Sequence, residues 1–398
     1  MTQTFDARST LVNHRQHFPA LLNKSYFNYG GQGPMPQGAI DALLKAHLYG
    51  QEHGPFSRKI GQWETQQMSE TRGAIATELQ VSPTTITLTE AVSTGCNIPL
   101  WGLDWQPGDQ VLVSDCEHPG IVAAINEICR RFGVESRTFP LLDTLNTGEP
   151  VERLQQGLTP KTRMVVLSHI LWNTGQVLPL KEMVEVCHQY PGDRGPVRVL
   201  VDAAQSAGVL PLSLADTGVD FYAFTGHKWF CGPAGLGALY VSPEAMDVIH
   251  PTYVGWRAIT QTPEGQPTGW LPDGRRFEVA TSDYTLLPAL REAIALHNRW
   301  GTTAERFSRI CQLSGYLWRQ LQTVDGIACL RATAPEAGLV SFTAANRDPG
   351  PVVQALEDRN IFVRVIRHPN CIRASVHYLT LESELDQLVE ALREILAA

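Results

Sequence analysis

Lys228 and Asp202 are the residues of this chain whose types and positions most clearly suggest chemistry. Lys228 lies in the string FYAFTGHKWFCGPAGLGALYV, and Asp202 lies in the earlier string VLVDAAQSAG. Each string begins as an apolar run and ends in small and polar residues, which is typical of a buried strand that delivers a charged group at its carboxyl end. An amine and a carboxylate at one sheet edge suit pyridoxal phosphate (PLP). The lysine can form a Schiff base with the aldehyde, and the aspartate can keep the ring nitrogen protonated.

Each of these two residues alone has a plainer interpretation. Lys228 could be an exposed lysine at a strand end, and Asp202 could cap a following helix. The residues Thr225, Gly226 and His227, directly before the lysine, favour the cofactor interpretation.

The motifs around both residues resemble those of the fold-type I PLP enzymes of the class V aminotransferase group, especially the cysteine desulfurases and their relatives. The string DAAQS from Asp202 matches that group's D-x-A-Q-S motif, and the string TGHK that ends at Lys228 matches its S/T-G-H-K motif. A glycine-rich segment follows, as in the group. The likeness extends from about Tyr26 to the C-terminal helix.

Composition narrows the class of protein further. The chain has 398 residues, of which 43% are hydrophobic, enough for a sizeable core and, by length, for two domains. A net charge of −8 argues against a nucleic-acid partner. The first residues lack the apolar stretch of a signal peptide, and no apolar run has the length of a membrane span. The eight cysteines include no CxxC pair. We therefore expect a cytoplasmic protein with reduced thiols and no metal or membrane partner.

Strand-like runs alternate with helix-length segments between residues 84 and 243, which predicts an α/β fold. The runs cover 85–89, 110–114, 135–139, 163–169, 197–202, 220–225 and 237–242. We expect a seven-stranded, mostly parallel sheet sandwiched by helices, with ligands beyond the carboxyl ends of its strands. The resemblance implies that the last run is antiparallel.

The rest of the chain is expected to form a smaller α+β domain. Residues 255–282 are rich in Gly, Pro and Thr and read as a long functional loop. A helix pattern follows from Asp283 to about Trp300, and helices are expected at 303–323, 350–359 and 382–397, with short strands between them. We predict a large PLP-binding domain over 21–282. The small domain would contain 283–398 and, by the resemblance, residues 1–20.

The segment LTEAVSTGCNIPLW is expected to bind the cofactor phosphate. It follows a strand and opens a helix, whose first backbone N–H groups can hold an anion. The residues at this turn are Ala91, Val92 and Ser93. They take the place of the group's T-S-G-A-T-E loop with two departures, and an ordinary helix start is the alternative. By the resemblance, Thr225 and His227 are further phosphate ligands.

The resemblance also implies which residues surround the cofactor ring. His118, in the string DCEHPG, would stack on the ring and move protons, although a lone histidine there could simply start a helix. Asn173 or the neighbouring Trp172 corresponds to the residue near the cofactor hydroxyl and the substrate. Gln205 is expected to donate to the 3′-oxygen of the ring.

The carboxylate of an amino-acid substrate is bound best by a two-pronged arginine. The string CIRASVHYLT matches the group's strand motif and assigns this role to Arg373, although a strand arginine could also be a solvated edge residue. Arg364 or Arg367 could meet a second carboxylate. Gly31 and Trp256 are expected pocket walls, although Trp256 could equally belong to the core.

The chain departs from the cysteine desulfurases at the cysteine that carries persulfide in those enzymes. The interval from Val365 to Ile372 is short, and the loop that bears the mobile cysteine is missing. Cys371 remains, two residues before Arg373 and within the expected strand. We expect it to be fixed and structural.

Without that nucleophile, we expect β-elimination. Lys228 would remove the α-proton, and the C–S bond of cystine or cysteine would break to give pyruvate, ammonia and persulfide or sulfide. Among relatives without the loop, the strings FNYGGQGPMP and TGCNIPLWGLDW resemble the cyanobacterial C–S lyases of cysteine and cystine. The alternatives are a desulfurase that uses Cys371, an epimerase or aminotransferase of the same group, and a PLP-binding scaffold without turnover.

The resemblance implies a homodimer with its sites at the interface. The string RRFEVATS matches the group's R-F-E-x-G-T segment, whose threonine reaches the cofactor phosphate of the other subunit, and this assigns Thr281. The expected partners are therefore an amino-acid substrate, a second copy of the chain and an acceptor of the persulfide in iron–sulfur cluster assembly.

Overall fold

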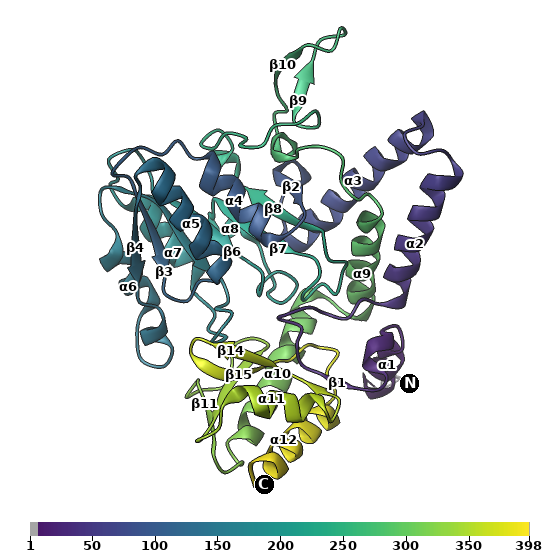
Figure 1. Cartoon of the computed structure of the whole chain (residues 1–398), viewed down its shortest axis with the longest axis vertical. Helices are drawn as coiled ribbons and strands as arrows, with labels where there is room; N and C mark the ends of the chain where they lie inside the picture. The colour runs from purple at the N-terminus through teal and green to yellow at the C-terminus, as the bar shows by residue number, and fades with distance from the viewer. Residues whose placement is uncertain (1–6, 398) are drawn as a thin grey trace, which may run out of the picture.

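The computed structural model describes residues 7–397, which form a large part built on a seven-stranded sheet and a smaller part built on a four-stranded sheet (Figure 1). Residues 1–6 and 398 lie outside the described residues, so the start of the predicted 1–20 segment is outside them as well. The predicted fold class, a mostly parallel sheet sandwiched by helices with a smaller α+β part, is confirmed.

The large sheet has the strand order β2-β8-β7-β6-β5-β3-β4. Its strands are β2 (Ile86–Thr89), β3 (Gln110–Ser114), β4 (Glu135–Phe139), β5 (Thr162–Ser168), β6 (Arg198–Asp202), β7 (Phe221–Thr225) and β8 (Gly237–Val241). Strand β8 is antiparallel to both of its neighbours, as expected, and the other pairs are parallel. Each of these seven predicted strands agrees with the structure to within one residue at each end. Six of them are short, largely buried runs, whereas β4, at the edge of the sheet, is mostly exposed.

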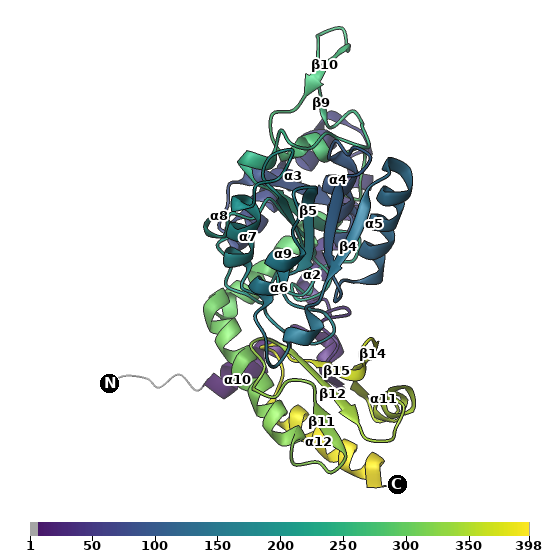
Figure 2. The same ribbon diagram turned by 90° about the vertical axis from the view of Figure 1, so that its left-hand side faces the viewer.

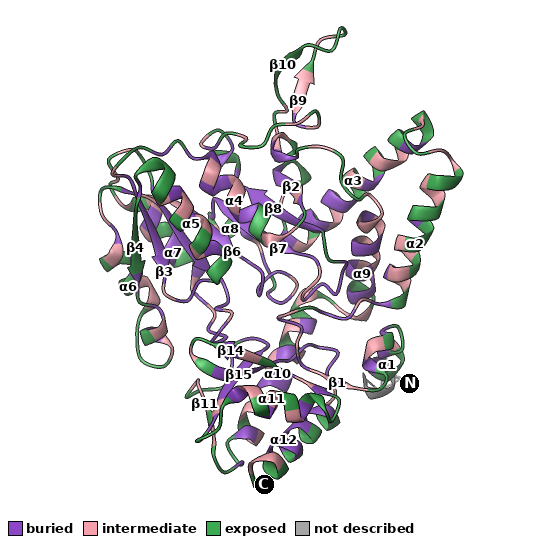
Figure 3. Cartoon of the chain, in the orientation of Figure 1, coloured by how far each residue is buried: buried purple, intermediate pink, exposed green. Residues whose placement is uncertain are grey.

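Helices cover both faces of this sheet because successive strand side chains point to opposite faces. Strand β3 places Val111 and Val113 in one core and Leu112 in the other. The first core is closed by α4 (Val92–Gly102) and α5 (Pro119–Phe132). Helices α3 (Arg58–Leu79), α6 (Pro150–Gly157), α7 (Leu180–Gln189), the short α8 (Leu214–Thr217) and α9 (Leu286–Trp300) contribute to the second. Helix α2 (Gln37–Glu52) packs on α9. Figure 2 shows the two helical layers, and Figure 3 shows the buried strands between them.

The smaller part has the antiparallel strand order β11-β12-β15-β14. Its elements are β11 (Ile327–Cys329), β12 (Leu339–Ala344), β14 (Arg364–Arg367), β15 (Asn370–Ser375), α10 (Thr303–Leu321), α11 (Pro349–Glu357) and α12 (Glu382–Ala397).

The N-terminal segment lies against this smaller part. Arg15, at the end of α1 (Ala7–Arg15), forms an ion pair of 2.6 Å with Glu384. Strand β1 (Ser25–Tyr26) pairs with β13 (Ile361–Phe362). The chain therefore contacts the smaller part before it enters the large one, and the division at 20/21 and 282/283 stays a prediction.

The expectation of a continuous loop over residues 255–282 is wrong. The segment contains a hairpin of β9 (Ile259–Gln261) and β10 (Pro267–Trp270), which projects from the large part in Figures 1 and 2. The strands are short and largely exposed, so no buried face imposes the apolar alternation by which a strand is recognised in a sequence.

Candidate active site

A cavity of about 720 Å³ lies at the carboxyl edge of the large sheet and is closed on one side by β14 and β15. Most of the predicted site residues line it: Gly31, Val92, Ser93, His118, Asp202, Gln205, Lys228, Arg364 and Arg373. Arg367 and Trp172 line it as well. The others lie outside its walls: Ala91, Asn173, Thr225, His227, Trp256 and Thr281.

Lys228 lies just after β7, where the backbone of the N-terminal segment comes close to it. The Gly33 N–H donates to the His227 carbonyl at 2.8 Å. A Cβ on Gly33 would lie 2.2 Å from the Lys228 carbonyl oxygen, so only glycine fits there. Burial lowers the pKa of Lys228 to about 8, the carboxylate of Asp202 opposes this shift, and the charge of Arg373 adds to it. A larger fraction of the amine is therefore neutral and nucleophilic near neutral pH than in an exposed lysine.

Asp202 ends β6 and is buried at the wall of the same cavity. Its Oδ1 accepts a hydrogen bond of 2.9 Å from the Ala204 N–H. The residues that follow form a turn, so the helix-cap interpretation is wrong. A buried carboxylate opposite Lys228 suits the protonated nitrogen of a PLP ring.

The first turn of α4 supplies donors for an anion. Val92 and Ser93 line the cavity, and Ala91, which precedes the helix, makes no side-chain cap bond. The first N–H groups of a helix have no partner within the helix and favour phosphate. Thr225 Oγ1 and His227 Nδ1 lie 2.7 Å apart just before Lys228. The first turn of α4 fits the phosphate of PLP, whereas Thr225 and His227 do not line the cavity and stay predicted ligands.

His118 starts helix α5 and also lines the cavity. The helix-start interpretation is therefore confirmed, and its role at the cofactor ring stays a prediction. Its Nδ1 accepts a hydrogen bond of 3.2 Å from the Gly120 N–H at the start of α5. Its ring lies edge to face with Trp172 at 5.5 Å between centroids. Burial, chiefly, lowers the pKa of His118, which favours the neutral imidazole with its proton on Nε2.

The structure places Trp172 and Asn173 differently relative to the cavity, and which of them meets the cofactor stays a prediction. Trp172 lines the cavity, whereas Asn173 is buried beside it and donates to the His368 carbonyl at 3.2 Å. The Asn173 Oδ1 is buried without a hydrogen-bond partner in the described chain, so a donor on a bound molecule would satisfy it.

Arg373 is buried on β15, and the solvated-edge interpretation is therefore wrong. Burial, chiefly, and then the charge of Arg364 lower the pKa of its guanidinium to about 10. Its Nη1 donates to the Trp172 carbonyl, and its Nε has no partner among the described residues. A buried cation with an unused N–H calls for an anionic ligand. Arg364 and Arg367 are exposed at the cavity mouth.

Gln205 is already bonded at both ends of its carboxamide. Its Nε2 donates to the Gly30 carbonyl at 2.9 Å, and its Oε1 accepts from Trp229 Nε1 at 2.9 Å. One N–H of Gln205 remains for the expected bond to the ring oxygen, so its first role in the structure is to hold the Gly30–Gly31 turn against the Lys228 segment.

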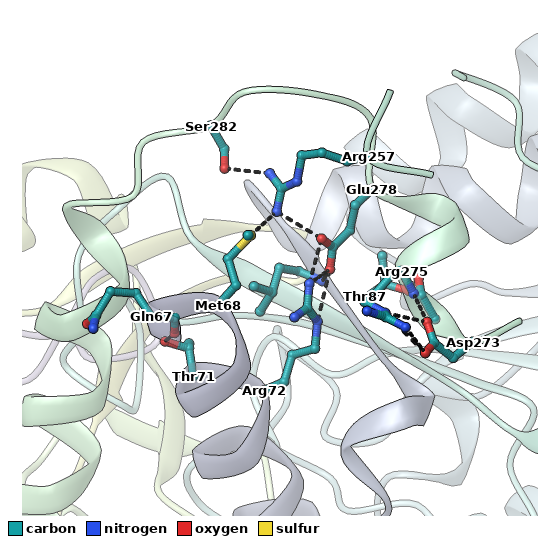
Figure 4. Close-up of polar contacts among 12 residues, drawn as sticks. Gln67, Met68, Thr71, Arg72, Thr87, Arg257, Asp273, Arg275, Glu278 and Ser282 are labelled. Atoms are coloured by element: carbon teal, nitrogen blue, oxygen red, sulfur yellow. Dashed lines mark hydrogen bonds and ion pairs between the residues drawn. The ribbon is translucent and has the colours of Figure 1, made fainter. Parts of the chain in front are cut away.

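Trp256 and Thr281 lie outside the cavity, on the segment that joins the sheet to α9. Trp256 is 58% exposed, so it does not belong to the core. Thr281 is exposed beside Arg257, whose Nη1 donates to the Ala280 carbonyl at 2.7 Å and to Ser282 Oγ at 3.0 Å (Figure 4). Glu278 forms an ion pair with Arg257 at 2.9 Å.

The same Glu278 also forms a 2.6 Å ion pair with Arg72 of α3. The two arginines therefore fix the path of the Thr281 segment on the large part.

Sequence reasoning missed several polar residues of the cavity wall, among them Asn28 and Ser168. Ser168 ends β5 at the same edge as Asp202, and this placement could have identified it. Asn28 precedes the Gly30–Gly31 turn, and only the pairing of its backbone with Ser375 brings it to the cavity.

Other kinds of site are not found in residues 7–397. No group of three or more His, Cys, Asp or Glu side chains in this range could hold a metal ion. No described helix is long and apolar enough to cross a membrane.

Comparison with known proteins agrees with this architecture. The chain matches the aminotransferase class V model over residues 25–388. It is 51% identical to the solved cystine C–S lyase C-DES in complex with its reaction product cysteine persulfide, with a TM-score of 0.93 over 95% of this chain and 99% of that chain. It is 28% identical to the isopenicillin N epimerase of Streptomyces clavuligerus over 94% of both chains. It is 27% identical to a probable cysteine desulfurase of Methanothermobacter thermautotrophicus, over 96% of this chain and 97% of the relative. The chain belongs to the class V aminotransferase family.

Proposed function

We propose that this chain is a PLP-dependent lyase that cleaves the C–S bond of L-cystine or L-cysteine by β-elimination, releasing pyruvate, ammonia and cysteine persulfide or sulfide. The observation that carries this proposal is a cavity lined by Lys228, Asp202 and Arg373, together with a Cys371 that is buried within β15. The 51% identity to a cystine C–S lyase supports it.

The residues that would hold PLP are Lys228 at its aldehyde, Asp202 at its ring nitrogen, and the first turn of α4 with Thr225 and His227 at its phosphate. When bound, PLP supplies an electron sink for the negative charge that develops at the substrate Cα. Every other part of the reaction falls to side chains of the chain itself.

Arg373 would orient the substrate through its α-carboxylate. A planar guanidinium can hold both carboxylate oxygens, which fixes the direction of the Cα–H bond toward Lys228. The free Lys228 Nζ, with a pKa of about 8, can take the α-proton near neutral pH. His118 can deliver a proton from Nε2 to the departing sulfur, because its Nδ1 is occupied by the Gly120 N–H.

Cys371 is poorly suited to the desulfurase alternative. It is 0% exposed in β15, where it pairs with Ile366. Burial is the main cause that raises the pKa of its thiol to about 11, which suppresses the nucleophilic thiolate. A persulfide carrier needs both a thiolate and freedom to move.

One assay separates the lyase from its alternatives. The purified protein is incubated with cystine and with cysteine in D₂O, and pyruvate, alanine, sulfane sulfur and deuterium at Cα are measured. Pyruvate with sulfane sulfur is the expected result. Alanine with protein-bound persulfide would identify a desulfurase, and deuterium exchange without pyruvate would identify an epimerase. The absence of every product would exclude the lyase for both substrates.

We further propose a cytoplasmic homodimer whose persulfide product supplies iron–sulfur cluster assembly. The exposed Thr281 segment and the exposed Tyr253 and Val254 near it support a partner on this face. A pull-down of iron–sulfur scaffold proteins together with sulfur transfer from labelled cystine tests the acceptor.

A further inference from the structure

Glu117 is a buried carboxyl group beside the active-site cavity to which the proposed reaction gives no role. It is 6% exposed. Within the described chain, its hydrogen bonds come from two serines: Ser114 Oγ donates to its Oε1 at 2.5 Å, the Ser168 N–H donates to Oε1 at 2.9 Å, and Ser168 Oγ donates to Oε2 at 2.8 Å. These serines end the neighbouring parallel strands β3 and β5. Glu117 therefore joins two strand ends at the edge where the cavity lies.

The strand register explains why a carboxylate is needed there. Strand β3 pairs with β5 only as far as Val113 and Val166. Strand β5 continues to Ser168, which still pairs with Asp202 of β6 on its other side. The Ser168 N–H is buried, and β3 does not extend far enough to offer it an acceptor. The Glu117 carboxylate accepts this hydrogen bond instead.

The same residue fixes the turn that presents His118. His118 follows Glu117 directly, and α5 begins one residue later. The Glu117 side chain is bonded to the ends of the sheet strands, while His118 lines the cavity. Burial, and then the charge of Asp202, raise the pKa of Glu117 to about 7 against the favourable bonds from the two serines. The fold thus retains at this position a carboxyl group whose burial is energetically unfavourable.

We propose that Glu117 is a positioning residue, which joins the turn bearing His118 to the strand end aligned with Asp202 and so holds these two cavity groups in one geometry. The inference rests on the proposed function in one respect, namely that His118 and Asp202 face bound PLP. It adds to that function a residue that contacts neither substrate nor cofactor.

The test compares Glu117→Leu and Glu117→Gln in the full-length protein. Leucine keeps the volume but removes all three bonds, whereas glutamine can still accept from the Ser168 N–H and bond a serine hydroxyl. Glu117→Leu is expected to weaken PLP binding roughly 10-fold or more, as for the loss of a hydrogen-bonded charged group. It should also move the His118 imidazole signals in a ¹H–¹⁵N spectrum, assigned with His118→Gln. Glu117→Gln should bind PLP with a dissociation constant within about threefold of the wild-type value. Its His118 signals should lie close to their wild-type chemical shifts.

Asp220→Asn is the matched control. Asp220 is 1% exposed and bridges strand starts at the opposite edge of the sheet, where its Oδ2 accepts from the Val199 N–H at 2.8 Å. It should lower the melting temperature without moving the His118 signals or the PLP dissociation constant. If Glu117→Leu does not fold, Ser114→Ala removes one of the three bonds and should change both readouts in the same direction.

The proposal is overturned if Glu117→Leu, or Ser114→Ala in its place, changes these two readouts no more than Asp220→Asn does. It is also overturned if Glu117→Gln is as impaired as Glu117→Leu. A wild-type protein that binds no PLP would instead contradict the proposed function, while the His118 signals would still report on Glu117.

Discussion

At the scale of single residues, Lys228 combines a reactive amine with a buried carboxylate partner. Its pKa of about 8 results from burial that Asp202 only partly offsets. Lys228→Ala should abolish covalent attachment of PLP. Borohydride reduction followed by peptide mass spectrometry should find the reduced cofactor on Lys228 in the wild type and on no residue in the variant. Lys181→Ala, which removes an exposed lysine, is the control and should behave as the wild type. A labelled lysine elsewhere would refute the assignment.

We expect Arg373 to anchor the substrate carboxylate, because it is buried and its Nε has no partner among the described residues. Arg373→Lys retains the charge but loses the planar pair of donors. KM for cystine should rise roughly 10- to 100-fold, the equivalent of one charged hydrogen bond, while the cofactor spectrum stays unchanged. Arg364→Lys and Arg367→Lys, tested in parallel, decide which exposed arginine meets a second carboxylate. If the KM for cystine is unaltered in Arg373→Lys, the α-carboxylate must instead be bound by Arg364 or Arg367.

Cys371 is expected to be dispensable for turnover because it is wholly buried and its thiol is held neutral. Cys371→Ser should leave pyruvate formation from cystine within a few-fold of wild type. A loss of roughly 100-fold in kcat, about 2.7 kcal/mol of barrier, would revive the desulfurase alternative. The melting temperature distinguishes a chemical loss from a packing loss.

At the scale of elements, Arg257 and Glu278 tie the segment with Thr281 to its own subunit (Figure 4). Thr281 does not line the cavity that contains Lys228. If it completes the phosphate site of a second copy, inactive Lys228→Ala and inactive Thr281→Asp proteins should complement each other. A hybrid dimer then has one site with both defects and one with neither, so activity returns toward half. Thr268→Asp, on the exposed hairpin, is the control and should remain active alone. No recovery after verified subunit exchange would place each site within one chain.

At the scale of the whole molecule, buried neutral histidines make the fold sensitive to acid. His297 bonds Tyr378 and the Phe230 carbonyl, which joins the smaller part to the Lys228 segment. Burial, chiefly, lowers the pKa of His297 to about 3 and that of His169 to about 4, and it holds that of His377 well below its usual value.

The sign of the pH effect follows from these depressed values. Below about pH 6.5 the unfolded chain takes up protons that the folded chain refuses, so the free energy of unfolding falls as the pH falls. One such histidine costs about 2 kcal/mol between pH 6.5 and 5. Glu117, with a raised pKa of about 7, acts in the opposite direction between roughly pH 7 and 4.5.

Urea unfolding at pH 7 and pH 5 tests this balance. The wild type should lose stability at the lower pH, and His297→Gln should lose less over the same interval, whatever its stability at pH 7. An equal pH dependence in both proteins would contradict the role of His297.

How much could be read from the sequence differs between the fold and the site. Six strands of the large sheet and α9 agree with prediction because their runs of apolar residues are local and buried, and β4 agrees although it is mostly exposed. The hairpin at 259–270 was missed because its strands bury no face. The pairing of β1 with β13 was missed because it joins residues far apart in the chain.

The sequence by itself determined the class of fold and the motifs that place Lys228, Asp202 and Arg373, because each depends on a short string of residue types. Only the tertiary structure decided that Arg373 and Cys371 are buried, that the amide of Gln205 is bonded to Gly30 and Trp229, and that Glu117 closes the end of β5. The physical reason is that burial, hydrogen-bond satisfaction and pKa depend on neighbours brought together from distant segments. No local pattern of residue types encodes those neighbours.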